Sequence, residues 1–325
     1  MLRVFVPDQP DPLTDLDAMA GALPPGVVWI DMITPTREEE AFIEAATGIG
    51  VPTRDEMAEI ETSSRLYSEN GAIYMTATIA TGIMREAAES NAVSFVLTPD
   101  HLITVRYADV LSFDRFAGHA ERAPNLCENP AIALIHLLDA VVDRLADSIE
   151  HISREVDAIS RQAFRRARTP GMQRLSNLVL QTLLVRLGSA QDALGKARDS
   201  AVSLTRALGY LAFAAPREAE LGPHIKSLTR DLASLTDHST YMSNNITFLL
   251  DAALGLISIE QNAVLKIFSV SAIVFMPPTL VAGIYGMNFD ILPELHWTYG
   301  YPWALAVMLA SAILPYVYFR WRGWL

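Results

Sequence analysis

Oxygen-bearing side chains recur at helical spacing in the C-terminal third of the sequence, with long apolar side chains between them. At about 100° per residue, seven positions of both kinds, one of them a glycine, fall within about 40° of one line along a helix. They are Asp251, Asn262, Leu265, Ser269, Met276, Gly283 and Met287. In a symmetric oligomer each position would form a ring, and rings of oxygen atoms suit hard cations such as Mg²⁺. The alternative for any one position is simple packing against a neighbouring helix.

Two long uncharged segments must position these side chains. Residues 267–289 and 297–319 are each 23 residues long without a charge, which is about 34 Å as a helix and enough to cross a bilayer. Aromatic residues gather at the two ends of the second segment, as in the interfacial belts of membrane helices: Trp297, Tyr299, Tyr301 and Trp303 at one end and Tyr316, Tyr318, Trp321 and Trp324 at the other. We therefore expect transmembrane helices at 266–289 and 297–319, the alternative being two buried helices of a soluble protein.

The charges around these segments predict their orientation. The connecting loop, 290–296, carries Asp290 and Glu294 but no Lys or Arg, whereas Lys266, Arg320 and Arg322 lie on the other side. By the positive-inside rule, both chain termini are cytoplasmic, and residues 320–325 form a basic cytoplasmic tail. The acidic loop would attract cations to the outer side of the membrane.

The part before Lys266 is acidic and has two kinds of pattern. It contains 35 of the 37 acidic and 22 of the 25 basic residues, a net charge of −13. Alternating apolar runs predict strands in an α/β domain at 1–125, where Thr53 and Glu56 also have the spacing of a helix-capping box. Apolar residues three and four apart predict long helices at 126–265. The expected fold class is an α+β cytoplasmic domain followed by a long helical stalk and two transmembrane helices.

Several classes of protein are disfavoured by what the sequence lacks. It has no GxxxxGK[ST] loop, HExxH helix or CxxC pair, which argues against an ATP-driven pump or a zinc hydrolase. No ionisable residue lies inside either uncharged segment, so a proton relay is not expected. We expect no enzymatic activity, no cofactor, no nucleic-acid partner and no intrachain disulfide, since Cys127 is the single cysteine.

Four short motifs resemble the CorA family of magnesium transporters. They are Tyr285-Gly286-Met287-Asn288, Pro293-Glu294-Leu295, Ile259-Glu260-Gln261-Asn262 and the terminal Gly323-Trp324-Leu325, in the family's order and spacing. The resemblance implies a funnel-shaped homopentamer in the inner (plasma) membrane of a bacterium, with Mg²⁺ as its cargo. It also implies pore-lining positions at Asn262, Leu265, Met276 and Thr279, and Asp251 lies on the same line. Leu265 replaces a methionine that is common in the family, which preserves a hydrophobic gate.

The residues that end the first span are candidates for an ion filter. Gly286, Met287 and Asn288 lie on the predicted outer side, where Asn288 would present its amide oxygen to a hydrated divalent ion. Mg²⁺ releases water reluctantly, so neutral amides that contact it through retained water cost less than stripping it. Gly286 would let backbones approach closely, and Met287 would pack against the adjacent helix. The alternative for Asn288 is a helix C-cap.

The acidity of the soluble part suggests regulation by its own cargo. Cytoplasmic Mg²⁺ bound between subunits would offset their repulsion and favour a closed state. Candidate ligands are Asp231 and Asp237, with Asp251 as a third, although each could be an ordinary solvated acid. Three other functions remain open: transport of Co²⁺ or Ni²⁺, transport of Zn²⁺ by a member of the same superfamily, and a membrane-anchored sensor or signalling role.

Overall fold

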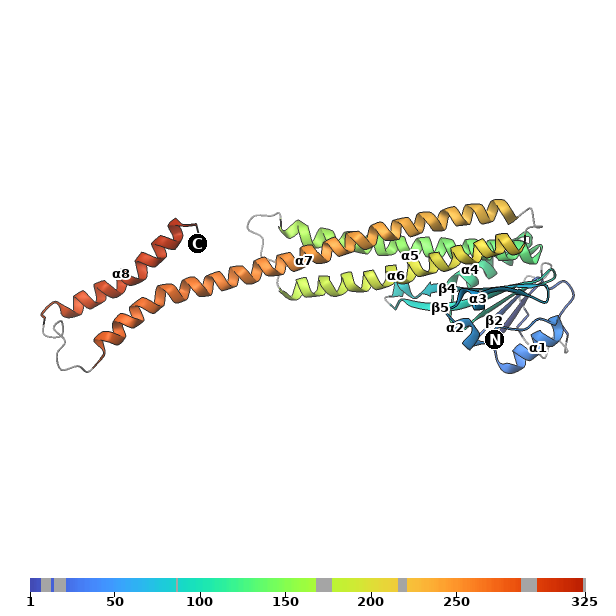
Figure 1. Cartoon of the computed structure of the whole chain (residues 1–325), viewed down its shortest axis with the longest axis horizontal. Helices are drawn as coiled ribbons and strands as arrows, with labels where there is room; N and C mark the ends of the chain where they lie inside the picture. The colour runs from blue at the N-terminus through green and yellow to red at the C-terminus, as the bar shows by residue number, and fades with distance from the viewer. Residues whose placement is uncertain are drawn as a thin grey trace. The chain divides into compact units, whose positions relative to one another are not determined.

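The computed structural model describes residues 1–6, 13–14, 22–85, 87–167, 177–215, 221–287 and 297–323. The chain divides into two compact units, Met1–Leu250 and Asp251–Leu325. The first unit contains a six-stranded sheet with helices on both faces, and the second contains the end of helix α7 and helix α8 (Figure 1).

The first unit begins with short strands and short helices and ends with long helices. The strands are β1 (Leu2–Phe5), β2 (Trp29–Ile33), β3 (Leu66–Glu69), β4 (Ala72–Thr81), β5 (Glu89–Leu97) and β6 (Leu102–Arg106). The short helices are α1 (Arg37–Thr47), α2 (Arg54–Ala58), α3 (Thr62–Arg65) and α4 (Leu111–Ala120), with 3-10 turns η2 (Ile83–Arg85) and η3 (Pro124–Cys127). The long helices are α5 (Pro130–Ala167), α6 (Asn177–Ala214) and α7 (Leu221–Tyr285).

The sheet is mixed, in the order β1-β2-β6-β5-β4-β3. Strands β2 and β6 are parallel, with Asp31 opposite Thr104, and the other neighbours are antiparallel. Asn70 and Gly71 connect β3 to β4, both at positive φ, as a tight hairpin turn requires. Helices α1 and α2 each begin with a capping box, Thr36 with Glu39 and Thr53 with Glu56, so the capping box predicted at Thr53 is confirmed.

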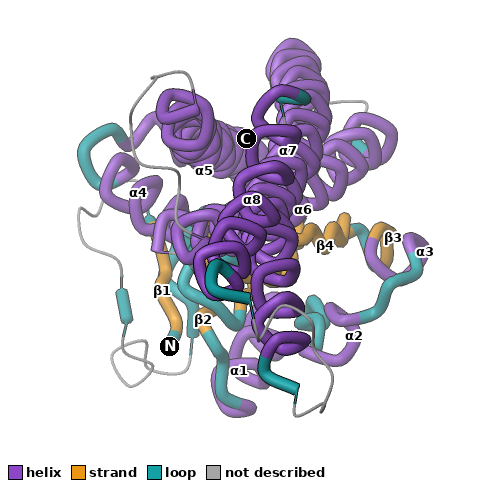
Figure 2. The backbone as a smooth tube through the Cα atoms, turned by 90° about the vertical axis from the view of Figure 1, so that its left-hand side faces the viewer, coloured by secondary structure: helices purple, strands orange, loops and turns teal. Residues whose placement is uncertain are grey.

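Successive strand residues point to opposite faces of the sheet and enter two separate cores. On one face, Ile30 and Val96 pack with Ile43 of α1 and Met57 of α2. On the other, Trp29 and the buried sides of α4, α5, α6 and the start of α7 form a larger core. Figure 2 shows α1 and α2 on one side of the sheet and the long helices on the other. The predicted segments 1–125 and 126–265 thus share a core in the structure, and those domain boundaries stay predictions.

The second unit carries the two segments that were expected to cross a membrane. In the described part of the chain, two helices are long and apolar enough to do so, α7 and α8 (Gly300–Trp321). Only 6% of the most apolar window of each helix is buried. A core helix of a soluble protein would be mostly buried, so this exposure favours membrane helices over that alternative. Helix α7 is a single helix of 65 residues, as expected for a stalk that continues into a membrane span.

Candidate permeation pathway

The predicted pore-lining residues all lie on α7 and all are exposed in the single chain. This holds for Asp251, Asn262 and Thr279, and also for the two proposed apolar constrictions. Leu265 is 62% exposed and Met276 is 69% exposed. Large apolar side chains that are this exposed in one chain are normally covered by another copy, a partner or lipid. The structure therefore leaves the predicted stripe available, and the assignment of its members to a pore stays a prediction.

An open groove of ≈ 630 Å³ follows the same side of α7 towards its C-terminal end. It is lined by Ala272, Phe275, Met276, Thr279, Leu280, Gly283, Ile284 and Met287. Three of the positions predicted from helical phase, Met276, Gly283 and Met287, are among them. Leu280 was missed from the sequence although it lies four residues after Met276, about 40° from it by the same spacing. Among the described residues of the lining, Thr279 is the one with a polar side chain.

Two adjacent prolines interrupt the hydrogen bonding of α7 beside that groove. Pro277 and Pro278 lie inside the helix and have no N–H, so the carbonyls of Ile273 and Val274 lose their usual donors. The hydroxyl of Thr279 donates to the carbonyl of Phe275 at 2.7 Å. Because this bond uses the hydroxyl proton, the lone pairs of the Thr279 oxygen are what it can offer to a water or an ion.

The described part of the predicted filter is the end of α7. The N–H of Gly286 donates to Ala282 at 2.9 Å, and the N–H of Met287 donates to Ile284 at 3.3 Å. A Cβ at position 286 would lie 3.1 Å from the Ala282 carbonyl oxygen, tighter than most such contacts. A glycine therefore suits this helix end. Asn288, Asp290 and Glu294 lie outside the described residues, and their roles stay predictions.

The two candidate regulatory acids are exposed and lie on different sides of α7. Asp231 and Asp237 are six residues apart, which is about 120° around a helix. Asp231 lies near Asp143 of α5: burial, then the charges of Asp139, Asp147 and Asp231, raise the pKa of the Asp143 carboxyl. Among the residues the structure describes, no group of three or more His, Cys, Asp or Glu could hold a metal. The structure does not bring Asp231 and Asp237 together within one chain.

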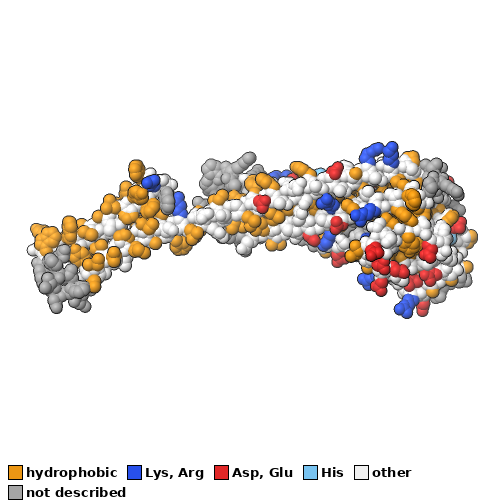
Figure 3. Space-filling model, in the orientation of Figure 1, with side chains coloured by type: hydrophobic (Ala, Val, Ile, Leu, Met, Phe, Trp, Pro, Cys, Tyr) orange, Lys and Arg blue, Asp and Glu red, His pale blue; other side chains and the backbone are white. Residues whose placement is uncertain are grey.

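Hydrophobic side chains cover the second unit where the two apolar segments lie (Figure 3). Just before α8, the ring of Trp297 lies edge-on to that of Tyr299 and is tilted against that of Trp303, and the centroid distance is 6.3 Å in both pairs. At the other end, Arg320 donates to the Tyr316 hydroxyl at 3.4 Å. An apolar helix with aromatic and basic residues at its ends has the pattern of a membrane-spanning helix.

Comparisons with known proteins agree with these features. The magnesium transport protein CorA of Yersinia pseudotuberculosis serotype I (strain IP32953) is 31% identical over 313 residues, 96% of this chain and 95% of that protein. The CorA protein of Escherichia coli (strain K12) is 31% identical over 298 residues, 92% of each chain. The family model "CorA-like Mg2+ transporter protein" matches residues 25–321.

Solved structures support the fold. The complete CorA magnesium transporter from Methanocaldococcus jannaschii aligns with a TM-score of 0.76 at 18% identity, over 97% of this chain and 95% of that one. The full-length CmaX protein aligns with a TM-score of 0.65 at 17% identity, over 98% and 96%. The predicted fold class, an α+β domain followed by a long helix and two candidate membrane helices, is confirmed. Since the family model spans most of the sequence and relatives at 31% identity span nearly all of it, the chain belongs to the CorA-like Mg²⁺ transporter family.

Proposed function

We propose that five copies of this chain assemble in the inner membrane and conduct Mg²⁺ into the cell through a path lined by α7. The observation that carries the proposal is the exposed stripe on α7, which combines oxygen-bearing Asp251, Asn262 and Thr279 with apolar Leu265 and Met276. Two membrane helices per chain cannot surround a water-filled path, so several copies are required. The number five and the funnel shape come from the resemblance to the family.

Ion selection takes place at the outer end of α7. The amide oxygens of a ring of Asn288 side chains accept hydrogen bonds from the waters bound to Mg²⁺. The loop acids Asp290 and Glu294 raise the local cation concentration. Gly286 supports this reading because a side chain there would press on the preceding turn of the helix. Selection acts on the hydrated ion, since six oxygens at about 2.0 to 2.1 Å are hard to replace with protein groups.

Closure takes place at the apolar rings. Narrow rings of Leu265 and Met276 exclude water when the pathway contracts, which stops ions without a charged plug. Asn262 supplies oxygen atoms just before the Leu265 ring along α7, and Thr279 supplies them just after the Met276 ring. The closed state is favoured by cytoplasmic Mg²⁺ bound to carboxylates at subunit boundaries, for which Asp231 and Asp237 are the candidates. Because they lie on different sides of α7, each would contact a different neighbour.

The membrane potential alone can drive the uptake. A divalent cation gains about 4.6 kcal/mol for each 100 mV of inside-negative potential, so no coupled proton or nucleotide is needed. With both termini in the cytoplasm, the acidic unit that precedes the first span faces the compartment whose Mg²⁺ level it senses. This arrangement makes the uptake self-limiting.

The test is ion flux into liposomes that contain the purified chain, run separately with Mg²⁺, Co²⁺, Ni²⁺ and Zn²⁺. We expect Mg²⁺ influx that increases with an inside-negative potential and falls when Mg²⁺ is enclosed on the cytoplasmic side. Influx of Zn²⁺ without Mg²⁺ would favour the Zn²⁺ transporter, and no flux of any ion would favour a sensor. Native mass spectrometry in mild detergent checks the assembly, and monomers or dimers alone would contradict the pentamer.

A further inference from the structure

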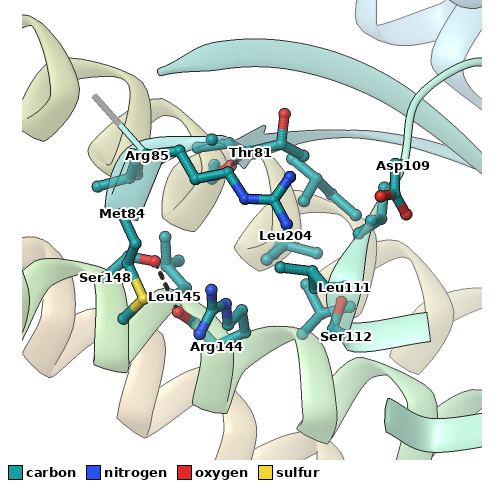
Figure 4. Close-up of a pocket in the computed structure, with 17 residues that line it drawn as sticks. Thr81, Met84, Arg85, Asp109, Leu111, Ser112, Arg144, Leu145, Ser148 and Leu204 are labelled. Atoms are coloured by element: carbon teal, nitrogen blue, oxygen red, sulfur yellow. Dashed lines mark hydrogen bonds between the residues drawn. The ribbon is translucent and has the colours of Figure 1, made fainter. Parts of the chain in front are cut away.

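A small pocket in the first unit has the composition of an anion site, and no part of the transport pathway uses it. Its volume is ≈ 150 Å³, and it lies between the end of β4, turn η2, the start of α4 and the facing sides of α5 and α6 (Figure 4). Turn η2 is fixed by N–H groups of Arg85 and Ala87 that donate to the Gly82 carbonyl at 2.8 and 3.2 Å. Gly82 has φ +70°, and a side chain there would collide with the carbonyl of Ala87.

The described lining of this pocket includes two guanidinium groups and one carboxylate. Arg85 is exposed and has no ion pair within the described ranges of the chain. The side chain of Arg144 is 22% exposed, and it is 4.0 Å from Asp147, which is itself 3.7 Å from Arg115. Among the described residues of the lining, Asp109 is the one that is acidic. The described part of the lining is therefore basic, on a chain whose net charge is −12.

One serine of the lining has a hydroxyl without a hydrogen-bond partner among the described residues. Ser112 is 1% exposed, lines the pocket and makes no hydrogen bond through its side chain to any residue that the structure describes. The other two serines of the lining are satisfied: Ser148 donates to the Arg144 carbonyl at 2.9 Å, and Ser200 donates to the Thr78 carbonyl at 3.0 Å. The Ser112 hydroxyl is therefore available to a ligand in the pocket.

Ser112 also belongs to the first turn of α4, a helix of 10 residues. The residue before this helix, Val110, provides no side-chain cap for its first N–H groups. The N–H of Phe113 donates to the Val110 carbonyl at 2.9 Å, so the donors of this turn without an acceptor among the described residues are the N–H groups of Leu111 and Ser112. Uncapped N–H groups at the positive end of a helix favour an anion.

We propose that this pocket binds a phosphate group. Two guanidinium forks, a free hydroxyl and a helix N-terminus supply more donors than the two oxygens of a carboxylate can accept, whereas a phosphate offers four oxygens. The volume suits one phosphate group and excludes a whole nucleotide, whose base and sugar would extend from the mouth. The ligand is free inorganic phosphate or the terminal phosphate of a nucleotide, and both place the same group between Arg85 and Ser112. Binding would tie β4 to α4 and α5.

The experiment is isothermal titration calorimetry on the full chain in detergent, at constant ionic strength, with inorganic phosphate and with ADP in separate titrations. The variants are Arg85→Gln, Arg144→Gln and Ser112→Ala, and the control is Arg122→Gln, which makes the same charge change beyond the opposite end of α4. We expect one saturable site per chain for wild type and for the control. Each arginine variant should bind about tenfold more weakly or worse, because a charge-assisted hydrogen bond is lost.

Arg85 is exposed, so its replacement leaves the fold intact, and circular dichroism verifies this for each variant. If ADP binds and competes with inorganic phosphate, the natural source is a nucleotide; if phosphate alone binds, it is the free anion. Absence of saturable binding by either titrant, or equal affinity in Arg85→Gln and Arg122→Gln, would overturn the site.

Discussion

The carboxylate of Asp31 and the guanidinium of Arg106 form a buried ion pair between the parallel strands β2 and β6. Arg106 donates from Nη2 to Oδ2 of Asp31 at 2.8 Å and from Nε to Oδ1 at 3.2 Å. Both side chains are 1% exposed. Thr104 donates to the same carboxylate at 2.9 Å and accepts a hydrogen bond from the indole of Trp29 at 3.0 Å. The core of the first unit therefore contains one continuous polar network.

We predict that Asp31→Ala lowers the free energy of unfolding by about 3 to 5 kcal/mol, because it leaves the buried guanidinium of Arg106 with only the more distant carboxylate of Asp114, at 3.8 Å. The control is Asp192→Ala, which removes a salt bridge to Lys196 on the surface of α6, where the acidic side chain is 62% exposed. That change should cost less than about 1 kcal/mol. Denaturant unfolding of the full chain in detergent measures both, and equal losses would contradict the prediction.

Asp143 should make the folded chain more stable as the pH falls, whereas a carboxylate that stabilises the fold makes it less stable. Its pKa is raised in the folded chain by burial and by Asp139, Asp147 and Asp231, so the folded state holds the proton more tightly than the unfolded state. The ionised form therefore costs stability at neutral pH, and the cost disappears as the pH falls through that raised pKa. We expect Asp143→Asn to raise the melting temperature near pH 7 and to have little effect in acid. An equal shift at both pH values would refute this, and exposed Asp157→Asn on the same helix is the control.

The gate proposal predicts a leak from one face of α7 only. Replacing Leu265 with Asn should hydrate the apolar ring and raise Mg²⁺ flux into liposomes when internal Mg²⁺ is high. Ile267→Asn makes a change of the same size two residues later, about 200° around the helix. Ile267 is also exposed, at 65%. The gate assignment fails if both variants leak equally or neither leaks.

The filter proposal predicts that Asn288→Ala loses Mg²⁺ transport without losing assembly. Alanine has no oxygen to accept the hydrated ion, whereas a helix cap would be replaceable with a modest loss of stability. Size-exclusion chromatography of the detergent-solubilised variant checks that assembly is unchanged. A correctly assembled variant that carries Mg²⁺ at the wild-type rate would remove Asn288 from the filter.

The regulatory proposal predicts weaker inhibition by internal Mg²⁺ in the variant Asp231→Asn/Asp237→Asn. Because the two acids lie on different sides of α7, each single variant should retain part of the inhibition. Flux at several enclosed Mg²⁺ concentrations gives the half-inhibiting concentration for each. Full inhibition of the double variant at the wild-type concentration would show that these two acids are not the sensor.

Features that depend on neighbouring residues could be predicted from the sequence, whereas contacts between distant residues could not. Uncharged length is a property of consecutive residues, and the apolar parts of α7 and α8 could be located from it to within a few residues. Helical phase likewise placed Met276 and Gly283 on one side of the helix, where both line the groove, and the same spacing includes Leu280. The pair Asp31 and Arg106 could not be inferred, because 75 positions separate the two residues and nothing in either neighbourhood indicates the other. The same is true of Arg85, Ser112 and Arg144, which come from three elements.

The adjacent prolines of α7 set a mechanical property of the second unit. In hydrocarbon a carbonyl without a donor costs several kcal/mol, so Ile273 and Val274 require help from water or from a neighbouring helix. Because two backbone hydrogen bonds are already missing at this place, the helix can bend there without breaking many more. Bending stiffness is therefore lowest around Met276, which lies between the unbonded carbonyls and the two prolines, and elastic deformation of α7 would concentrate where large apolar side chains line its groove.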